Sequence, residues 1–335
     1  MRARALRAAA WGVVAAGVVA PLVRKRVTAR PVVVQTVAFC APVGLCVAVR
    51  RSPARDVAAC CLQMWAYVTA YKYPHDDEAG QAQRVRIDYP IAVDRALGLG
   101  ELPTVRLQRR FARVGPGGPE WRTLDRVLVW AHWSWFMVPH GALAYILAFH
   151  RSRFDRAAAL TYAVFDIGAM IYWVLPTAPP WYAAAAPERG VETANKDTQA
   201  PRRPIEVRRM MVEYGESFWG DNWSPLYSVL GGNPLAAMPS LHFATSVMAA
   251  LLLTETGPVA GAVGWTYAAT LGFALVYLGE HYAADLLAGA ALTLAVRGVA
   301  PWAAPSLRRG ARGVAGLEAR AHGAKAFAAK AHGAG

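Results

Sequence analysis

The chain has 335 residues, of which 55% are hydrophobic and only 17% charged, and its formal net charge is +14. Soluble globular domains carry about 25% charged residues, so this composition excludes an ordinary soluble protein and favours a membrane protein. The basic residues lie between apolar segments and in the tails, as in cytoplasmic loops, and no nucleic-acid-binding motif accompanies them. We therefore expect membrane lipids as partners and no nucleic acid.

Residues 1–71 are predicted to form N-terminal transmembrane helices. They contain apolar stretches at 8–23, 31–49 and 57–71, although the first and third are short for the roughly 20 residues that cross a bilayer. The first stretch has the basic start of a signal peptide, but the sequence RKR directly after it favours a retained signal anchor. The four cysteines lie in these stretches without partners at metal-ligand spacing, so they are interpreted as small buried hydrophobic residues.

A polar segment, 72–125, follows, and IAVDRALGLG within it is interpreted as a short interfacial helix. Residues 126–300 are predicted to be the membrane catalytic core. Its apolar spans are 126–149, 157–176, 237–254, 257–279 and 282–299. Because open strands cannot cross lipid, the fold class is predicted to be all-α, a polytopic membrane helix bundle with six to eight transmembrane helices.

The short loop 150–156 carries three arginines between two spans, which places it in the cytoplasm. The long segment 177–235 is then an extracytoplasmic cap. The tail 301–335 is basic and Ala/Gly-rich, and is predicted to be disordered or bound to the membrane surface. The abundance of Ala, Arg, Gly and Val indicates a bacterial source, hence a multi-pass protein of the bacterial plasma membrane.

This topology places two histidines at the same membrane depth. His242 starts one span and His281 starts another, both on the extracytoplasmic side. Asp285 follows His281 by four residues, so the two share a helix face, and the carboxylate can fix the tautomer of the imidazole. We therefore predict that His281, His242 and Asp285 are catalytic. The alternative to catalysis is that His281 at a helix start forms only a local pair with the acidic side chain one turn later.

A phosphate site is predicted next to them. Pro239 fits the first turn of a helix, where its missing N–H costs nothing, and the free N–H groups of that turn, with the Ser240 hydroxyl, can bind an anion. Basic residues in the preceding outer segment favour a phosphate. They are Lys196, Arg202, Arg203, Arg208 and Arg209. The alternative for each is a solvated charged loop.

These residues resemble the type 2 phosphatidic acid phosphatase superfamily of membrane lipid phosphatases and phosphotransferases, over roughly 125–300. KDTQAPRRP matches the Lys-x6-Arg-Pro motif with Lys196 and Arg203, and HYAAD supplies His281 and Asp285 of the Ser-Arg-x5-His-x3-Asp motif. PSLH matches Pro-Ser-Gly-His except for Leu241, and this form is similar to the branch of the fungal inositol phosphorylceramide synthases.

One departure from the family pattern matters for the chemistry. The Ser-Arg of the third motif would fall at Ala274 and Leu275, so its arginine is absent and another cation must act instead.

The resemblance implies a two-step phosphoryl transfer on a lipid-linked phosphate, without a metal or other cofactor. His281 attacks phosphorus, Asp285 holds its ring, and His242 first protonates the leaving oxygen and then activates the acceptor. Water as acceptor makes the protein a phosphatase, and an inositol or sugar hydroxyl makes it an inositolphosphotransferase-like enzyme, which the PSLH form favours. A non-catalytic transporter or scaffold is the alternative that the missing arginine supports.

Other polar and aromatic residues have two interpretations. His132 and His140 are expected to pack in the core or at an interface, with a role in a substrate cavity as the alternative. Four aromatic residues of the cap either frame an acceptor or anchor the cap at the membrane surface. These are Trp181, Tyr182, Trp219 and Trp223.

Overall fold

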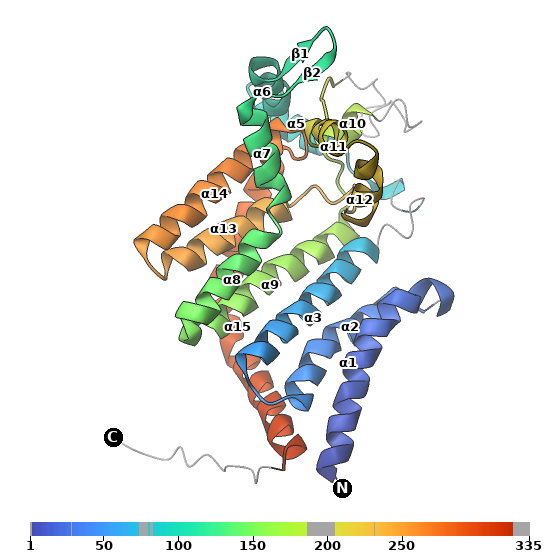
Figure 1. The fold of residues 1–335 in the computed structure, drawn as a ribbon, viewed down its shortest axis with the longest axis vertical. Helices are drawn as coiled ribbons and strands as arrows, with labels where there is room; N and C mark the ends of the chain where they lie inside the picture. The colour runs from blue at the N-terminus through green and yellow to red at the C-terminus, as the bar shows by residue number, and fades with distance from the viewer. Residues whose placement is uncertain are drawn as a thin grey trace. The chain divides into compact units, whose positions relative to one another are not determined.

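The computed structural model describes residues 2–27, 29–73, 80, 83–185, 205–230 and 232–323 (Figure 1). The chain forms two compact units, Met1–Tyr73 with Gly298–Gly335 and Pro74–Arg297. In the described residues the only strands are a three-residue pair, and the rest of the regular structure is helical. The prediction of an all-α membrane bundle is therefore confirmed.

The first unit contains α1 (Arg2–Val27), α2 (Pro31–Ala48), α3 (Pro53–Lys72) and the end of α15 (Ala283–Ala321). Small residues bring α1 and α2 close together, as they do between helices in membranes. A Cβ on Gly17 would lie 2.6 Å from the Cβ of Ala41. At the start of α3, Arg55 forms a 3.1 Å ion pair with Glu318 of α15.

The second unit holds the remaining elements. They are α5 (Asp88–Leu97), α6 (Pro103–Phe111), β1 (Arg113–Gly115), β2 (Gly118–Glu120), α7 (Thr123–Trp133), α8 (Met137–Phe149), α9 (Arg151–Val174), α10 (Pro180–Ala184), α11 (Met210–Trp219), the 3-10 turn Gly220–Asn222, α12 (Trp223–Leu230), α13 (Leu241–Thr254), α14 (Pro258–Tyr277) and the start of α15. Strands β1 and β2 form an antiparallel hairpin with Arg113 opposite Glu120. Helix α13 packs against α8, α9 and α14 (Figure 1).

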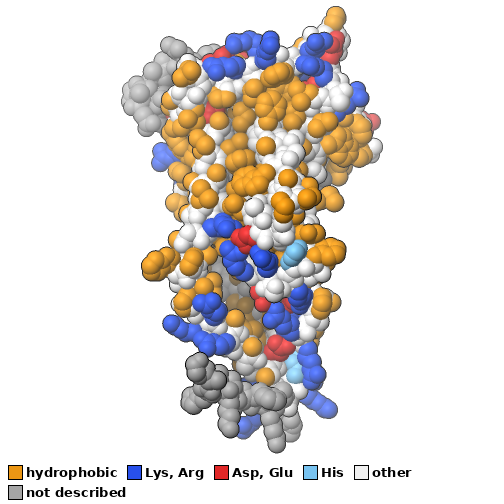
Figure 2. Space-filling model, turned by 90° about the vertical axis from the view of Figure 1, so that its left-hand side faces the viewer, with side chains coloured by type: hydrophobic (Ala, Val, Ile, Leu, Met, Phe, Trp, Pro, Cys, Tyr) orange, Lys and Arg blue, Asp and Glu red, His pale blue; other side chains and the backbone are white. Residues whose placement is uncertain are grey.

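Within the described residues, α1, α2, α9, α14 and α15 are long and apolar enough to cross a membrane. Helices α8 and α13 are apolar but have only 13 and 14 residues. The expectation of six to eight crossings therefore included helices that are shorter than a helix must be to cross a bilayer. Hydrophobic side chains cover much of the face shown in Figure 2, which suits a lipid environment.

The single span expected at 126–149 is interrupted. Helix α7 ends at Trp133 and α8 begins at Met137. The proline at 139 has no N–H to donate, which costs nothing only in the first turn of a helix. A helix that starts just before Pro139 satisfies this condition, whereas one continuous helix does not.

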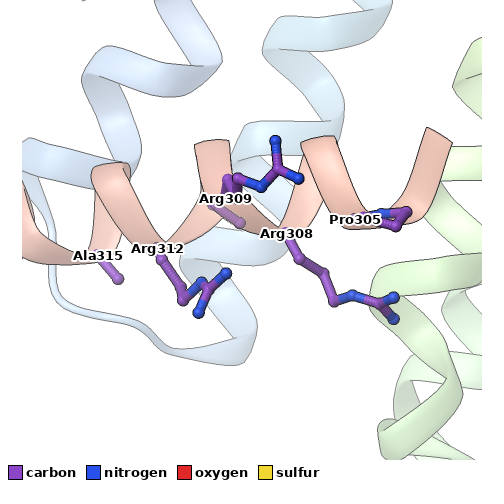
Figure 3. A pocket seen from close by; sticks show the side chains of 6 residues that line it. Pro305, Arg308, Arg309, Arg312 and Ala315 are labelled. Carbon is purple, nitrogen blue, oxygen red and sulfur yellow. The ribbon is translucent and has the colours of Figure 1, made fainter. Parts of the chain in front are cut away.

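The tail differs from the expectation of disorder from residue 301, because α15 continues to Ala321. Alanine, leucine and arginine are good helix formers and dominate this stretch. Arg308, Arg309 and Arg312 project from α15 in Figure 3 and are exposed. A helix of 39 residues is about 58 Å long, which is longer than the roughly 30 Å hydrocarbon core of a bilayer.

The leucine of PSLH has a structural explanation. Leu241 is buried, and a Cβ added to Gly168 of α9 would lie 2.3 Å from its Cδ2 atom. Because Gly168 has no side chain, it leaves a space beside α9 that the side chain of Leu241 fills. Leu241 and Gly168 together set how closely α13 approaches α9.

Candidate active site

His242, His281 and Asp285 form one hydrogen-bonded series at the starts of α13 and α15. His242 Nδ1 lies 3.2 Å from His281 Nε2, and His281 Nδ1 lies 3.2 Å from Asp285 Oδ2. A carboxylate only accepts, so His281 Nδ1 carries the proton and donates it to Asp285. Nε2 of His281 then carries the lone pair that accepts a hydrogen bond from the Nδ1–H of His242.

Burial isolates His281 and Asp285 from solvent, whereas His242 is half-buried. His281 is 4% exposed and Asp285 is fully buried. Asp285 Oδ2 also accepts the Tyr282 backbone N–H at 2.9 Å, so the carboxylate closes the first turn of α15 as well as holding the imidazole. The same residue therefore fixes both the helix start and the histidine ring.

Ser240 lies at the N-cap of α13 and is fully buried. Its Oγ accepts from the Phe243 N–H at 3.3 Å, and its own N–H donates to the Asp285 carbonyl at 2.9 Å. These bonds tie the start of α13 to the start of α15. The structure thus places Ser240 beside the histidine pair, and its role towards a phosphate stays a prediction.

A third histidine lies against the pair. The ring of His132, at the end of α7, stacks on His242 with centroids 5.1 Å apart and planes at 25°. Trp135 contacts His242 with a centroid distance of 4.2 Å and donates Nε1–H to Thr245 at 2.9 Å. His132 Nδ1 is buried and has no hydrogen-bond partner among the described residues. His242 therefore packs against two rings, one from the last turn of α7 and one from the turn between α7 and α8.

This part of the site was not found from the sequence. His132 was interpreted as a packing residue because its spacing pointed to His140 and to no motif. His140 instead hydrogen-bonds the Phe136 carbonyl at 2.7 Å. The expectation of one continuous span at 126–149 concealed the turn that brings His132 to His242. Pro139 was the sequence signal that could have revealed this turn.

Arg209 lies next to the turn that precedes His281. Its Nε donates to Glu280 at 3.2 Å, its Nη2 donates to the Tyr227 hydroxyl at 2.6 Å, and its guanidinium lies 3.5 Å from the ring centre of Trp181. Burial raises the pKa of the Tyr227 phenol, which keeps it neutral. These three contacts hold the Arg209 guanidinium against Glu280, which is the residue before His281.

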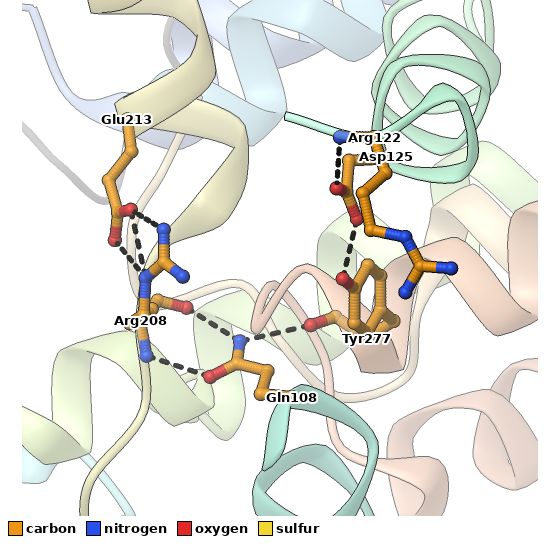
Figure 4. Close-up of polar contacts among 6 residues, drawn as sticks. All are labelled: Gln108, Arg122, Asp125, Arg208, Glu213 and Tyr277. Atoms are coloured by element: carbon orange, nitrogen blue, oxygen red, sulfur yellow. Dashed lines mark hydrogen bonds and ion pairs between the residues drawn. The ribbon is translucent and has the colours of Figure 1, made fainter. Parts of the chain in front are cut away.

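The segment that carries Arg209 is fixed to the turn after α14 (Figure 4). Gln108 of α6 donates Nε2–H to the carbonyls of Arg208 at 2.8 Å and Tyr277 at 2.9 Å, while its Oε1 accepts the Arg208 N–H at 2.9 Å. Gly279 has a φ of +83°, and a Cβ there would lie 2.6 Å from the Arg208 carbonyl. Only glycine permits this close approach.

The other predicted phosphate-binding residues are placed differently. The Arg208 side chain points to Glu213, with Nε donating to Oε2 at 3.0 Å (Figure 4), and not to the histidines. Lys196 and Arg203 lie outside the described residues. The structure therefore places Ser240 at the start of α13 and pairs Arg209 with Glu280, the residue before His281, while Arg208 pairs with Glu213.

Asp94 of α5 supports the start of α15. Its Oδ1 accepts the Ala284 N–H at 2.8 Å, and its side chain is fully buried. Burial raises the pKa of Asp94 to about 6, and the hydrogen bonds from the α15 N-terminus only partly oppose this. The polar segment before the core thus contributes a helix cap to the histidine site.

Comparison with known proteins identifies the family. The model of the PAP2 superfamily matches residues 120–299, which include the histidine series and the α7–α8 break. The chain belongs to the PAP2 superfamily.

Fungal relatives match part of the chain. The inositol phosphorylceramide synthase of Candida albicans is 32% identical over 130 residues, 39% of this chain and 26% of that protein. The inositol phosphorylceramide synthase catalytic subunits of Schizosaccharomyces pombe and Saccharomyces cerevisiae are 28% identical over 180 residues and 29% over 129. These two alignments cover 52% and 38% of this chain and 40% and 30% of the relatives. The chain thus spans less than half the length of these relatives, and no solved structure matches it.

Proposed function

We propose that this PAP2 superfamily member is a membrane enzyme that transfers a phosphorus-containing group from a lipid-linked phosphate through a phosphohistidine intermediate, without a metal ion. The observation that carries the proposal is the hydrogen-bonded series from Asp285 through His281 to His242. The relatives named inositol phosphorylceramide synthase support an inositolphosphotransferase-like reaction. The site is proposed to face the extracytoplasmic side of a bacterial plasma membrane.

In the first step, Nε2 of His281 attacks phosphorus. The bond from phosphorus to the lipid oxygen breaks as the new N–P bond forms. His242, which enters this step as the doubly protonated imidazolium, gives one proton to the departing oxygen and becomes neutral. Asp285 accepts from His281 Nδ1 and stabilises the positive charge that develops on the ring. The two imidazole nitrogens are 3.2 Å apart in the free protein, which leaves no room for a phosphorus atom, so the substrate must replace the hydrogen bond between them.

In the second step, His242 acts as a base. It takes the proton of water or of an acceptor alcohol, whose oxygen attacks phosphorus and releases His281. Charge on the transferred group is stabilised by fixed cations and N–H donors. We propose Arg209 as the main one, in place of the motif arginine whose position is taken by the buried Leu275. Ser240, Arg208, Lys196 and Arg203 complete the proposed phosphate-binding group.

The acceptor is tested by a donor and acceptor screen. Purified protein is given phosphatidic acid or phosphatidylinositol, with and without added alcohols. We expect a new phosphodiester that forms only when an acceptor alcohol is present. Release of phosphate at the same rate with and without alcohols would establish a phosphatase instead. If neither donor is consumed, the protein is a non-catalytic transporter or scaffold and the proposal is wrong.

Stacking on His242 is predicted to matter for the rate. We expect His132→Ala to lower kcat roughly tenfold, because His242 loses one of the two rings that fix its orientation. His132→Phe keeps a flat ring in the same place and should stay within about threefold of the parent protein. Initial rates on the same donor check both variants. Equal losses in the two variants would show that the His132 nitrogen, and not stacking, is what the reaction needs.

A further inference from the structure

The second half of α15 presents a hollow of about 570 Å³ at the surface of the first unit. Its lining consists of Pro305, Arg308, Arg309, Ala311, Arg312 and Ala315. Arg308 and Arg312 are one helical turn apart and project from the same side of α15 in Figure 3. Because the other side chains of the wall are proline and alanine, the three arginines supply all of its polar side-chain groups.

The positive charge of these arginines is not balanced within the described part of the chain. All three side chains are exposed, and none of their guanidinium groups has an ion-pair or hydrogen-bond partner among the described residues. Glu318 is the only acidic residue between positions 298 and 323, and it pairs with Arg55 at 3.1 Å. The hollow therefore attracts an anion from outside the chain.

The opposite side of the helix holds α15 in its unit. Val314 and Ala321 pack in one apolar cluster with Ala10 of α1 and Val47 of α2. At 3.6 residues per turn, Val314 and Ala321 lie on the side of the helix away from Arg312. The arginines are therefore not needed for this packing, and their face stays open to a ligand.

Further basic side chains surround the same apolar cluster. The cluster brings the start of α1 and the end of α2 to the end of α15, and the exposed arginines of these segments are Arg2, Arg4, Arg7, Arg50 and Arg320. Helices α1 and α2 are both long and apolar enough to cross a membrane. Clusters of arginine at the ends of membrane spans attract the anionic headgroups of the cytoplasmic leaflet.

Exposed apolar side chains beside the arginines favour a lipid over a soluble anion. Trp302 precedes Arg309 by seven residues, which is two turns along the same side of the helix, and it is 82% exposed. Leu307, next to Arg308, is 64% exposed. Tryptophan is enriched where a bilayer meets water, and apolar residues next to unpaired arginines match the boundary between acyl chains and phosphates.

We propose that the arginine face of α15, formed by Arg308, Arg309 and Arg312, binds the phosphate of an anionic glycerophospholipid. A guanidinium donates two parallel N–H bonds to phosphate oxygens, so Arg308 and Arg312 hold one phosphodiester from two sides. An acyl chain of the same lipid lies against Trp302. None of the three arginines belongs to the proposed phosphate-transfer site, so this lipid is a bound partner and not the donor.

Lipid binding to the purified full-length protein tests this proposal. The protein in a neutral detergent is titrated with dioleoyl phosphatidylglycerol or dioleoyl phosphatidylcholine, and the first bound lipid is followed by native mass spectrometry. We expect the parent protein to prefer phosphatidylglycerol. The triple variant Arg308→Gln, Arg309→Gln and Arg312→Gln should raise the Kd for phosphatidylglycerol at least about tenfold, because each arginine near an anionic headgroup adds to the affinity.

The matched control removes three charges from the second unit, at exposed arginines, by Arg110→Gln, Arg113→Gln and Arg126→Gln. It should bind phosphatidylglycerol like the parent. If the first triple variant does not fold, Arg312→Gln alone is measured and should weaken binding about threefold.

Three outcomes overturn the proposal. The first is equal affinity of the parent protein for the two lipids. The second is a Kd for phosphatidylglycerol that is unchanged in the folded arginine variant, or raised equally in the control. The third is loss of the bound lipid when millimolar inorganic phosphate is added, which would show that the hollow is a site for a soluble anion.

Discussion

Replacing His281 with glutamine is expected to lower kcat by more than about a thousandfold. Glutamine can still hydrogen-bond Asp285, but its amide nitrogen has no lone pair available to attack phosphorus, so no covalent intermediate forms. The measurement is the initial rate of donor consumption, together with acid-labile label on the protein after rapid quenching with a ³²P-labelled donor.

The control for this variant is His150→Gln, at the junction of α8 and α9. It should keep the parent rate and the parent amount of label. A His281→Gln protein that still became labelled, or that retained more than a tenth of the parent rate, would rule out His281 as the nucleophile.

The second large effect is expected from the packing of α15 on α13. A Cβ on Gly289 would lie 2.5 Å from the carbonyl oxygen of Ser240. This neighbour is backbone and cannot rotate away, so Gly289→Val must push the two helices apart. His242 and His281 are carried by these helices, and a misplacement of about 1 Å can cost about a hundredfold in rate. We expect kcat to fall by about that factor.

Gly298→Val is the matched control, because it makes the same substitution on the same helix where no atom lies within 4 Å of the added Cβ. It should leave kcat unchanged. Circular dichroism and detergent-exchange chromatography establish that both proteins are folded. Equal activity of the two variants would show that the spacing of α13 and α15 does not control the histidine pair.

Helix positions were largely predictable, because a bilayer imposes length and apolarity on any segment that crosses it. The sequence located α2, α13 and α14 within a few residues, but α9 begins at Arg151, inside the segment 150–156 that was predicted to be a loop. It missed the break between α7 and α8, since hydropathy is continuous there and only Pro139 marks the new start. It also missed the helical part of the tail. The low complexity and charge of that stretch indicated disorder, although many of its residues are good helix formers.

The histidine series was predictable for a different reason. The i,i+4 spacing of His281 and Asp285 is local, and a charge-based topology put His242 at the same depth. In the structure these side chains do meet, while their catalytic role stays a proposal. The residues around them come from α5, α6, α7 and the segment before α11, and no local pattern links them.

The sequence by itself determined that this is a membrane protein, that its fold is helical and that two histidines pair. Hydropathy, loop charge and helix periodicity depend on residues close together in the sequence, so they can be recognised without knowing how the helices pack. Only the tertiary structure decided which cation approaches the pair, which rings hold His242, and why leucine follows Ser240. Those answers depend on side chains distant in sequence: Arg209 beside Glu280, His132 on His242, and Leu241 in the space that Gly168 leaves on α9. Contacts of this kind are set by how whole helices pack.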